Sequence, residues 1–422
     1  MPKGLTALLA DVTPLRISPA FRRLWAGTVL STVGGGLTRF AVSLQVYQLT
    51  RSPAAVGLLG IAQLMPTLTI GLLGGTVTDS VDRRRLVLGT SCGLWAVSAG
   101  FAAVSFAGPP LAGARLVWIL YGLVVVQAAL TAIDQPARST FTAGLLPPAQ
   151  IPAALALNRV IFQVALTASP AIGGLITAVP HLGLRACYVI DAASFGAAIY
   201  GVARLPPMRP AQASQRDLRA VLDGIRFIRH QQALAGAFLA DLAFTVLGLP
   251  VALFPAINAE RFGGDPRILG LLTTAVGVGG LVGVVLSGPL RHVRRPGLAM
   301  LECVALSGAA FAVFAIAPGL PLTLAALAVV GAADGFTVVF RGTIAQTVTP
   351  GELRGRVMAA DFVIGAGGSQ LGYLESGAVG SLATPDISAL SGGLATIVAV
   401  LLIGALIPGL RRYRLPRPAA DA

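Results

Sequence analysis

Some charged side chains lie inside long apolar stretches of the sequence, where they could bind an ion, pair with one another or exchange a proton. Five of them are of most interest: Arg39, Asp241, Asp334, Arg341 and Glu375. A charge within a membrane-length apolar segment is energetically costly, so it usually marks a ligand path or an ion pair. These five residues are the first candidates for a site inside the protein.

Asp334 is the leading candidate because of its neighbours. It lies in the segment Gly331-Ala-Ala-Asp334-Gly335, where the glycines leave room for water or a ligand to approach. A carboxyl group partly removed from water can change its protonation near neutral pH. Arg341 follows two helical turns later, about 10 Å along the helix axis on nearly the same face. The segment predicts a proton-exchanging carboxyl group, and a static ion pair between helices explains it equally well.

A second group of charges lies in a short turn between two apolar stretches. It begins at Gly75 and contains Asp79, Asp82 and a triplet of arginines at 83–85. Lysine and arginine accumulate in short loops on the cytoplasmic side of a membrane. The triplet therefore indicates the cytoplasmic side, although topology alone does not explain the two acids among the arginines.

The elements that carry these residues are predicted to be membrane-spanning helices. The chain has 422 residues, is 55% hydrophobic and has a mean hydropathy of +0.80. A helix needs about 20 mostly apolar residues to cross a bilayer. Twelve stretches qualify: 24–49, 54–78, 86–107, 116–135, 153–179, 184–203, 234–257, 269–290, 298–317, 322–346, 357–382 and 388–410.

The net charge of +14 does not indicate nucleic-acid binding. With the N-terminus in the cytoplasm, most of the 31 lysines and arginines fall in cytoplasmic loops and tails. That distribution is typical of a multi-pass protein of the inner (plasma) membrane with both termini in the cytoplasm. Arg51, Arg115, Arg185, Arg261 and Arg267 are the basic residues expected on the outer side.

Cofactor chemistry finds little support in the sequence. Cys92, Cys187 and Cys303 occur singly, and there are three histidines, so neither a metal site nor a disulfide framework is expected. The one lysine, Lys3, does not follow a glycine-rich phosphate loop. We expect no cofactor, no metal and no ATP-driven step. An integral-membrane enzyme would need a cluster of histidines or acids at one membrane face, and the only dense cluster is the turn at 75–85.

The chain divides into two halves that echo each other. We expect a six-helix bundle over 1–204, a cytoplasmic linker over 205–232 and a second six-helix bundle over 233–422. Residues 138–147 align with 341–350 at an offset of 341 − 138 = 203, which also places Asn158 on Asp361 and Gly174 on Gly377. Two repeated halves that face each other at the bilayer midplane are the plan of a secondary transporter.

The linker contains one amphipathic segment. Apolar residues recur at helical spacing over 218–228, and charged residues fill the other face. This pattern predicts a helix on the inner membrane surface. A calmodulin-type target is an alternative with less support.

The turn at 75–85 resembles the loop 2–3 signature of the major facilitator superfamily, with Ser80 and Asp82 as departures from the usual pattern. The resemblance implies an all-α membrane fold of twelve helices in two pseudo-repeated halves. It also implies a conformational gate made by Gly75, Asp79, Arg83, Arg84 and Asp134. In that gate Asp79 faces the start of the eleventh helix, where a helix N-terminus attracts a carboxylate, and Arg83 pairs with Asp134.

The segment Ser169-Pro170-Ala-Ile-Gly173-Gly174 resembles the Gly-Pro-x-x-Gly antiporter motif of drug exporters, with serine in place of a glycine. A proline interrupts a helix, and small residues let helices pack closely. A kinked, close-packed helix without a transport role explains the same residues.

Other segments resemble the enterobactin-exporter-like branch and its macrolide-efflux relatives, among them 279–283, 295–298 and 351–357. In that superfamily helices one, four, seven and ten line the central cavity, so Arg39, Asp241, Asp334 and Arg341 become candidates for substrate or proton binding. Asp191 and Glu302 lie in helices that are peripheral in that superfamily, and they are expected to be interhelical or interfacial.

These patterns together predict a secondary exporter, coupled to protons, that moves a siderophore or a lipophilic drug by alternating access. The expected partners are a small-molecule substrate, protons and the lipid bilayer, and the expected state is a monomer. An uptake permease of the same fold is the alternative. The sequence does not identify the substrate, the coupling ion, the stoichiometry or the direction.

Overall fold

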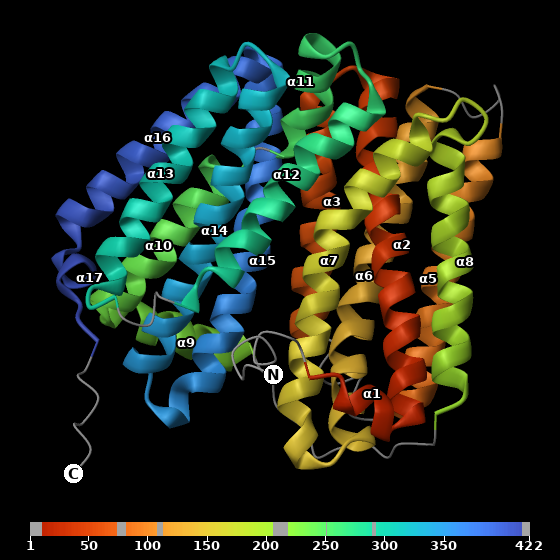
Figure 1. Cartoon of the computed structure of the whole chain (residues 1–422), viewed down its shortest axis with the longest axis horizontal. Helices are drawn as coiled ribbons and strands as arrows, with labels where there is room; N and C mark the ends of the chain where they lie inside the picture. Colours follow the sequence, from red (N-terminus) through yellow and green to blue (C-terminus); the bar gives the residue numbers. More distant parts are fainter. Residues whose placement is uncertain are drawn as a thin grey trace, which may run out of the picture. The chain divides into compact units, whose positions relative to one another are not determined.

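The structure is a computed structural model that describes residues 11–73, 82–107, 113–205, 218–249, 251–288 and 293–415 (Figure 1). Within these ranges all regular elements are helical. In the part of the chain that the structure describes, ten helical segments are long and apolar enough to cross a membrane, and one of these is the interrupted segment Gln232–Arg261. The less apolar helices α2 (Pro19–Thr50) and α15 (Arg354–Leu382) complete the predicted set of twelve. Helices satisfy their own backbone groups, which is what a bilayer interior requires.

Contacts divide the chain into two compact units. Unit 1 comprises Met1–Leu49 and Met65–Gln215, and unit 2 comprises Thr50–Leu64 and Arg216–Ala422. Unit 1 holds α2, the end of α3 (Pro53–Leu73) and the elements α1 (Thr13–Ile17), α5 (Arg83–Phe106), α6 (Ala114–Leu145), η2 (Pro148–Gln150), α7 (Ile151–Thr177) and α8 (Gly183–Ala203). Unit 2 holds the start of α3, α15 and the elements α9 (Leu218–His230), α10 (Gln232–Leu247), η3 (Val251–Leu253), α11 (Phe254–Arg261), α12 (Pro266–Val285), α13 (Pro296–Ile316), α14 (Leu320–Val348), η5 (Gly351–Leu353), α16 (Pro385–Leu406) and α17 (Pro408–Arg412).

The two units repeat the same order of elements at the predicted offset of 203 residues. Helices α6 and α14 end at 145 and 348, the short helices η2 and η5 begin at 148 and 351, and α7 and α15 begin at 151 and 354. Helices α8 and α16 end at 203 and 406. The pseudo-repeat predicted from the sequence is present, so residues 203 apart in these elements occupy equivalent positions.

Many helices begin at a proline, whose fixed φ suits the first helical turn and whose missing N–H costs nothing there. Pro53, Pro266, Pro296 and Pro385 start α3, α12, α13 and α16. Elsewhere a side chain caps the helix: the carboxylate of Asp82 accepts a hydrogen bond of 3.1 Å from the backbone N–H of Arg85. These signals fix where α5 and the four proline-started helices begin.

The seventh span differs from its prediction. The stretch 234–257 was expected to be one helix, but α10 ends at Leu247 and a second helix, α11, begins at Phe254. Gly248 caps α10, and Pro255 lies in the first turn of α11, a position that proline tolerates and a helix interior does not. Gly248 and Pro255 were visible in the sequence and marked the interruption.

In unit 2 the start of α3 packs against the end of α15. Gly57 lies so close to α15 that a Cβ atom there would stand 2.5 Å from the carbonyl oxygen of Tyr373 and 3.1 Å from the Cα of Gly377. The backbone N–H of Ala54 donates a hydrogen bond of 2.8 Å to the Oγ of Ser381. Residues without side-chain bulk are required at this crossing, as is common where membrane helices pack closely.

The amphipathic segment of the linker forms the helix α9, as predicted, and part of this helix packs against protein. Val221 and Ile228 are buried, and α9 packs against the start of α15. Gly224 lies against the carbonyl group of Arg356, with no room for a Cβ atom, and Asp223 makes an ion pair of 2.9 Å with Arg356. Part of the apolar face of α9 therefore packs against protein, whereas Leu222 on the same helix is exposed, and a position at the membrane surface stays a prediction.

Candidate functional site

The main ionic cluster of unit 2 joins three helices. The Nη1 atom of Arg341 on α14 lies 2.7 Å from Oδ2 of Asp241 on α10 and 3.0 Å from Oδ1 of Asp361 on α15. The contact with Asp241 has the geometry of a hydrogen bond. The Nη1 atom of Arg341 thus lies within ion-pair distance of two carboxylates, which come from two different helices.

The cluster is largely removed from water. The exposed fractions of the side chains are 4% for Asp241, 14% for Arg341 and 28% for Asp361. The guanidinium carbon of Arg341 also lies 5.6 Å from the centre of the Phe238 ring, a distance at which a cation is attracted to an aromatic face. Buried charges are tolerated only when they are paired, so the two acids and the arginine depend on one another.

Asp334 does not have the contact with Arg341 that its spacing suggested. Among the described residues, Arg341 makes its ion pairs with Asp241 and Asp361, and no hydrogen bond or ion pair joins it to Asp334. Seven residues separate Asp334 and Arg341 by about 10 Å along a helix, whereas packing brings α10 and α15 within direct reach. Asp334 nevertheless interacts electrostatically with the charges of both Asp241 and Arg341.

In unit 1 the predicted pair between Arg83 and Asp134 is not formed. The carboxylate of Asp134 accepts a hydrogen bond of 2.6 Å from the Oγ1 of Thr90 and pairs with the Nε of Arg138. Arg138 also donates a hydrogen bond of 2.7 Å to the Oγ of Ser91. Arg138 lies four residues after Asp134 on α6, a spacing that brings the two side chains together within one helix, so Asp134 is already neutralised without Arg83.

The structure describes only some of the other residues that were predicted to form the gate. Arg83 begins α5, and Arg84 donates a hydrogen bond of 2.5 Å to the carbonyl oxygen of Ala203 at the end of α8. A cation at a helix C-terminus meets carbonyl groups that have no partner within the helix. Gly75 and Asp79 lie outside the described residues, so their predicted roles stay predictions.

The antiporter-like segment on α7 packs closely against α2. Ser169 donates a hydrogen bond of 3.1 Å to the carbonyl oxygen of Val33, and Gly36 faces the Ser169 side chain without room for a Cβ atom. At Gly173 a Cβ atom would stand 2.7 Å from the ring of Phe40. Pro170 and Gly174 are buried in the same helix. This packing is what the structural alternative for the segment predicted, and a transport role stays a prediction.

Asp191 joins three helices of unit 1, as predicted. It lies on α8 and accepts hydrogen bonds of 2.7 Å from Thr38 on α2 and Ser98 on α5. Arg39, the next residue on α2, is exposed, and its charge acts on Asp191. Of the remaining acids, Glu375 is partly buried on α15 and Glu302 is exposed on α13.

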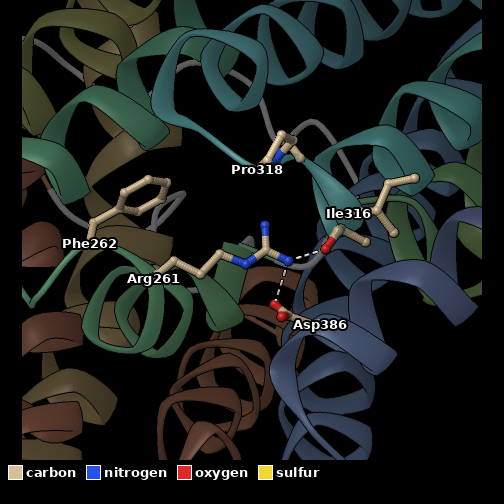
Figure 2. Close-up of a pocket in the computed structure, with 7 residues that line it drawn as sticks. Arg261, Phe262, Ile316, Pro318 and Asp386 are labelled. Atoms are coloured by element: carbon tan, nitrogen blue, oxygen red, sulfur yellow. Dashed lines mark hydrogen bonds and ion pairs between the residues drawn. The ribbon is translucent and has the colours of Figure 1, made fainter.

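A cavity of about 400 Å³ in unit 2 was not predicted from the sequence (Figure 2). Arg261 at the end of α11 reaches across it, donates a hydrogen bond of 2.9 Å to the carbonyl oxygen of Phe314 and pairs at 2.7 Å with Asp386 at the start of α16. The Arg261 guanidinium also contacts the carbonyl oxygen of Ala315, so it closes the C-terminal end of α13. Arg261 thus joins the ends of three helices, and its donors are largely used within the protein.

Among the described residues, no three His, Cys, Asp or Glu side chains come together in a way that could hold a metal ion. The functional groups that the structure does bring together are carboxylates and guanidinium groups inside apolar helices. Twelve membrane-spanning segments in two repeated halves are the layout of the major facilitator fold.

Comparison with known proteins gives the family. A family described as "Transmembrane secretion effector" matches residues 9–420, and the chain belongs to this family of the major facilitator superfamily. It is 28% identical over 418 residues to the enterobactin exporter EntS of Citrobacter koseri, and 27% identical over 419 residues to that of Shigella boydii serotype 18. Each alignment covers 98% of both chains.

Solved structures share the fold. A bacterial homologue of the human lysosomal transporter Spinster, in an inward-facing and unoccupied conformation, has a TM-score of 0.72 at 12% identity and covers 95% of this chain and 99% of its own. A bacterial homologue of the iron transporter ferroportin has a TM-score of 0.71 at 15% identity, with 94% and 99% covered. These likenesses extend to the fold alone. The family match and the full-length relatives show that the protein is a multi-pass membrane transporter.

Proposed function

We propose that this transporter is a proton-coupled exporter that moves a small amphipathic molecule, a siderophore or a lipophilic drug, out of the cytoplasm by alternating access. The main support is the ionic cluster of Asp241, Arg341 and Asp361 inside a chain whose full-length relatives are enterobactin exporters. Charges at this depth are expensive unless they serve a proton, an ion or a substrate.

The proposed roles follow the predicted sites. Asp334, Asp241 and Glu375 are the candidate proton-exchanging acids, with Asp334 first as in the sequence analysis. The expectation that the glycines beside Asp334 leave room for water or a ligand is wrong, because a Cβ atom at Gly331 would stand 2.0 Å from the carbonyl oxygen of Val276 and one at Gly335 would stand 2.8 Å from that of Gly280, both on α12. Arg341 balances these acids, and Arg39, exposed on α2, is a candidate contact for the substrate. Gly75, Asp79, Arg83, Arg84 and Asp134 are proposed to form the gate at the cytoplasmic side. Both termini are proposed to lie in the cytoplasm, and the protein to work as a monomer.

The test of this function is transport by purified protein in proteoliposomes with an imposed pH gradient. Enterobactin is the first probe because the relatives export it, and ethidium is the second. We expect accumulation that stops when a protonophore collapses the gradient. If the probe accumulates equally with and without the pH gradient, the proposed coupling to protons is wrong.

Two variants assign roles in the same assay. Asp334→Asn should lose gradient-driven accumulation yet keep exchange of labelled for unlabelled probe, because exchange moves no net proton. Asp79→Asn should slow both modes, because it alters the proposed gate. Glu302→Gln, which changes an exposed acid on α13, is the matched control. If Asp334→Asn keeps full gradient-driven transport, Asp334 has a structural role. Asp241 or Glu375 is then the next candidate for the proton-exchanging acid.

The direction of transport needs a cellular experiment. A deletion strain should retain siderophore inside the cell and release less into the medium, or should become more sensitive to lipophilic drugs. Reduced uptake of a nutrient, with unchanged siderophore release and drug sensitivity, would instead support the permease alternative.

A further inference from the structure

The short helix α17 is firmly packed into unit 2. Leu410 is fully buried, and it lies against Gly236 in the first turns of α10 and Gly297 at the start of α13, where neither glycine has room for a Cβ atom. Gly409 lies just as closely against the side chain of Gln232, which begins α10. Helix α17 therefore holds a fixed position where the starts of α10 and α13 meet the end of α16.

Four arginines surround this meeting point. Arg411 and Arg412 end α17, and Arg294 and Arg295 immediately precede α13. The backbone N–H of Leu415 donates a hydrogen bond of 3.3 Å to the carbonyl oxygen of Arg294, so the chain after α17 runs beside the residues before α13. We call these four residues the α17 arginine cluster. All four are exposed, and in the part of the chain that the structure describes their side chains make no ion pair or hydrogen bond.

The acids of neighbouring elements do not balance the α17 arginine cluster. Asp223 on α9 is already paired with Arg356 on α15. Glu352 in η5 is exposed, and Glu302 lies further along α13. Arg229, at the end of α9 and shortly before the start of α10, adds another exposed guanidinium group. This end of unit 2 thus carries an excess of positive charge, and the chemistry that would neutralise it is anionic.

The equivalent end of unit 1 uses an arginine within the protein. Arg84, at the start of α5, donates a hydrogen bond of 2.5 Å to the carbonyl oxygen of Ala203 at the end of α8. In the repeat, α13 and α16 are the counterparts of α5 and α8. Arginines are common at the cytoplasmic ends of membrane helices, so their number alone indicates no ligand. The convergence of two arginine pairs on a packed helix, without internal partners, is what distinguishes unit 2.

An apolar surface leads directly to the α17 arginine cluster. Leu402 and Leu406 are spaced so that they share one face of the last turns of α16, and their exposed fractions are 53% and 77%. Helix α16 is a membrane-spanning segment, so exposed leucines on it suit the acyl chains of lipids. Guanidinium groups bind phosphate through paired hydrogen bonds. Leucines followed by arginines therefore match both parts of a phospholipid.

We propose that this end of unit 2 is a binding site for an anionic phospholipid. The α17 arginine cluster binds the phosphate of the headgroup, and Leu402 and Leu406 lie along the acyl chains. A lipid with net negative charge is favoured over a zwitterionic one because the excess of arginine repels a choline or ethanolamine cation. The bound lipid supplies the anion that the protein itself lacks here, and it joins the start of α13 to the end of α17. The site requires neither proton coupling nor export.

The first experiment measures lipid binding to the detergent-purified, full-length protein by native mass spectrometry. Phosphatidylglycerol is compared with phosphatidylcholine that has the same acyl chains. The wild type should bind phosphatidylglycerol about tenfold more tightly, because several arginines near the membrane surface each attract an anionic lipid. Equal affinity for the two lipids would overturn the proposal, and this comparison needs no variant.

The second experiment locates the site. A variant that carries both Arg411→Gln and Arg412→Gln should lose about tenfold in affinity for phosphatidylglycerol. The matched control carries both Arg22→Gln and Arg23→Gln, which remove an adjacent pair of exposed arginines on α2 and the same amount of charge. This control should bind phosphatidylglycerol as the wild type does. If both variants lose affinity equally, the lipid responds to total charge and the α17 site is wrong.

Inorganic phosphate distinguishes a lipid site from a site for a free anion. At equal concentration it should not displace phosphatidylglycerol, because it lacks the acyl chains that contact α16. If inorganic phosphate displaces the lipid as effectively as unlabelled phosphatidylglycerol does, the leucines take no part and the assignment to a lipid is wrong. A failure of proton-driven transport would leave all three binding results unchanged, so this proposal and the proposed function are tested separately.

Discussion

Arg138 and Arg341 occupy equivalent positions in the two repeats, since 138 + 203 = 341, yet they are held in different ways. In unit 1 Arg138 pairs with Asp134 of its own helix and donates to Ser91 of α5. In unit 2 Arg341 pairs with Asp241 of α10 and Asp361 of α15. The residue equivalent to Asp134 is Thr337, and the residue equivalent to Asp361 is Asn158.

The difference shows that equivalent positions in the two repeats can have two different uses. The ion pair of Arg138 lies within α6, and the hydrogen bonds of the pair reach the neighbouring helix α5, so Arg138 joins two helices of unit 1. A pair that spans three helices depends on their arrangement and changes when that arrangement or the charge on an acid changes. Unit 2 is therefore the half in which charge and helix packing are coupled.

Arg341→Gln should be the most damaging single change in this comparison. It leaves Asp241 and Asp361 without a cation in a largely buried site, and breaking a buried ion pair in this way costs about 3–5 kcal/mol. We expect a clearly lower denaturation temperature of the detergent-purified protein and a lower yield from membranes. Arg341→Lys is the control that keeps the charge and should recover part of the loss. A denaturation temperature equal to that of the wild type would show that Asp241 and Asp361 do not depend on Arg341.

Arg138→Gln should destabilise the protein less than Arg341→Gln does. Only one carboxylate loses its cation, and Thr90 still donates to Asp134. We expect a loss of about 1–3 kcal/mol, the typical cost of leaving a buried hydrogen-bonding group poorly paired. The same thermal measurement ranks the two variants. If Arg138→Gln is as damaging as Arg341→Gln, the two arginines carry similar structural weight and the contrast between the units fails.

Asn158→Asp should make unit 1 more like unit 2, with the smallest effect. The Nη1 of Arg138 is buried and has no hydrogen-bond partner among the described residues, and position 158 is where the repeat places the second acid. A new carboxylate there should stabilise the protein by about 0.5–1 kcal/mol. In an Arg138→Gln background the gain should vanish, which a double-mutant cycle measures. A gain of equal size in both backgrounds would show that the new acid does not pair with Arg138.

Much of the fold was predictable because its signals are local. Apolar stretches of membrane length, prolines at helix starts and the offset of 203 residues are all properties of nearby residues or of the repeat. Gly248 and Pro255 are also local signals, and they mark the interruption of the seventh span. The continuous apolar character of 234–257 nevertheless led to the prediction of one helix.

The ionic partners were harder to predict because they depend on which helices pack together. Nothing in the spacing of Asp241, Arg341 and Asp361 brings them within 3 Å, since they come from α10, α14 and α15. The pair of Asp134 and Arg138 is different, since its spacing of four residues within one helix is visible in the sequence, whereas the family resemblance pointed to Arg83. Asp361 was also visible as an acid in an apolar helix, at the repeat position of Asn158.

Helix α3 has a further mechanical consequence. Its first part, through Leu64, belongs with α15 in unit 2, and its remainder from Met65 belongs to unit 1. Pro66 lies two residues after that division and deprives the carbonyl group of Ala62 of its hydrogen bond. A helix bends most easily where one of its backbone hydrogen bonds is missing. Helix α3 is therefore least stiff next to the point where it passes from unit 2 to unit 1, so it can bend there without disturbing the packing of Gly57 against Gly377 near its start.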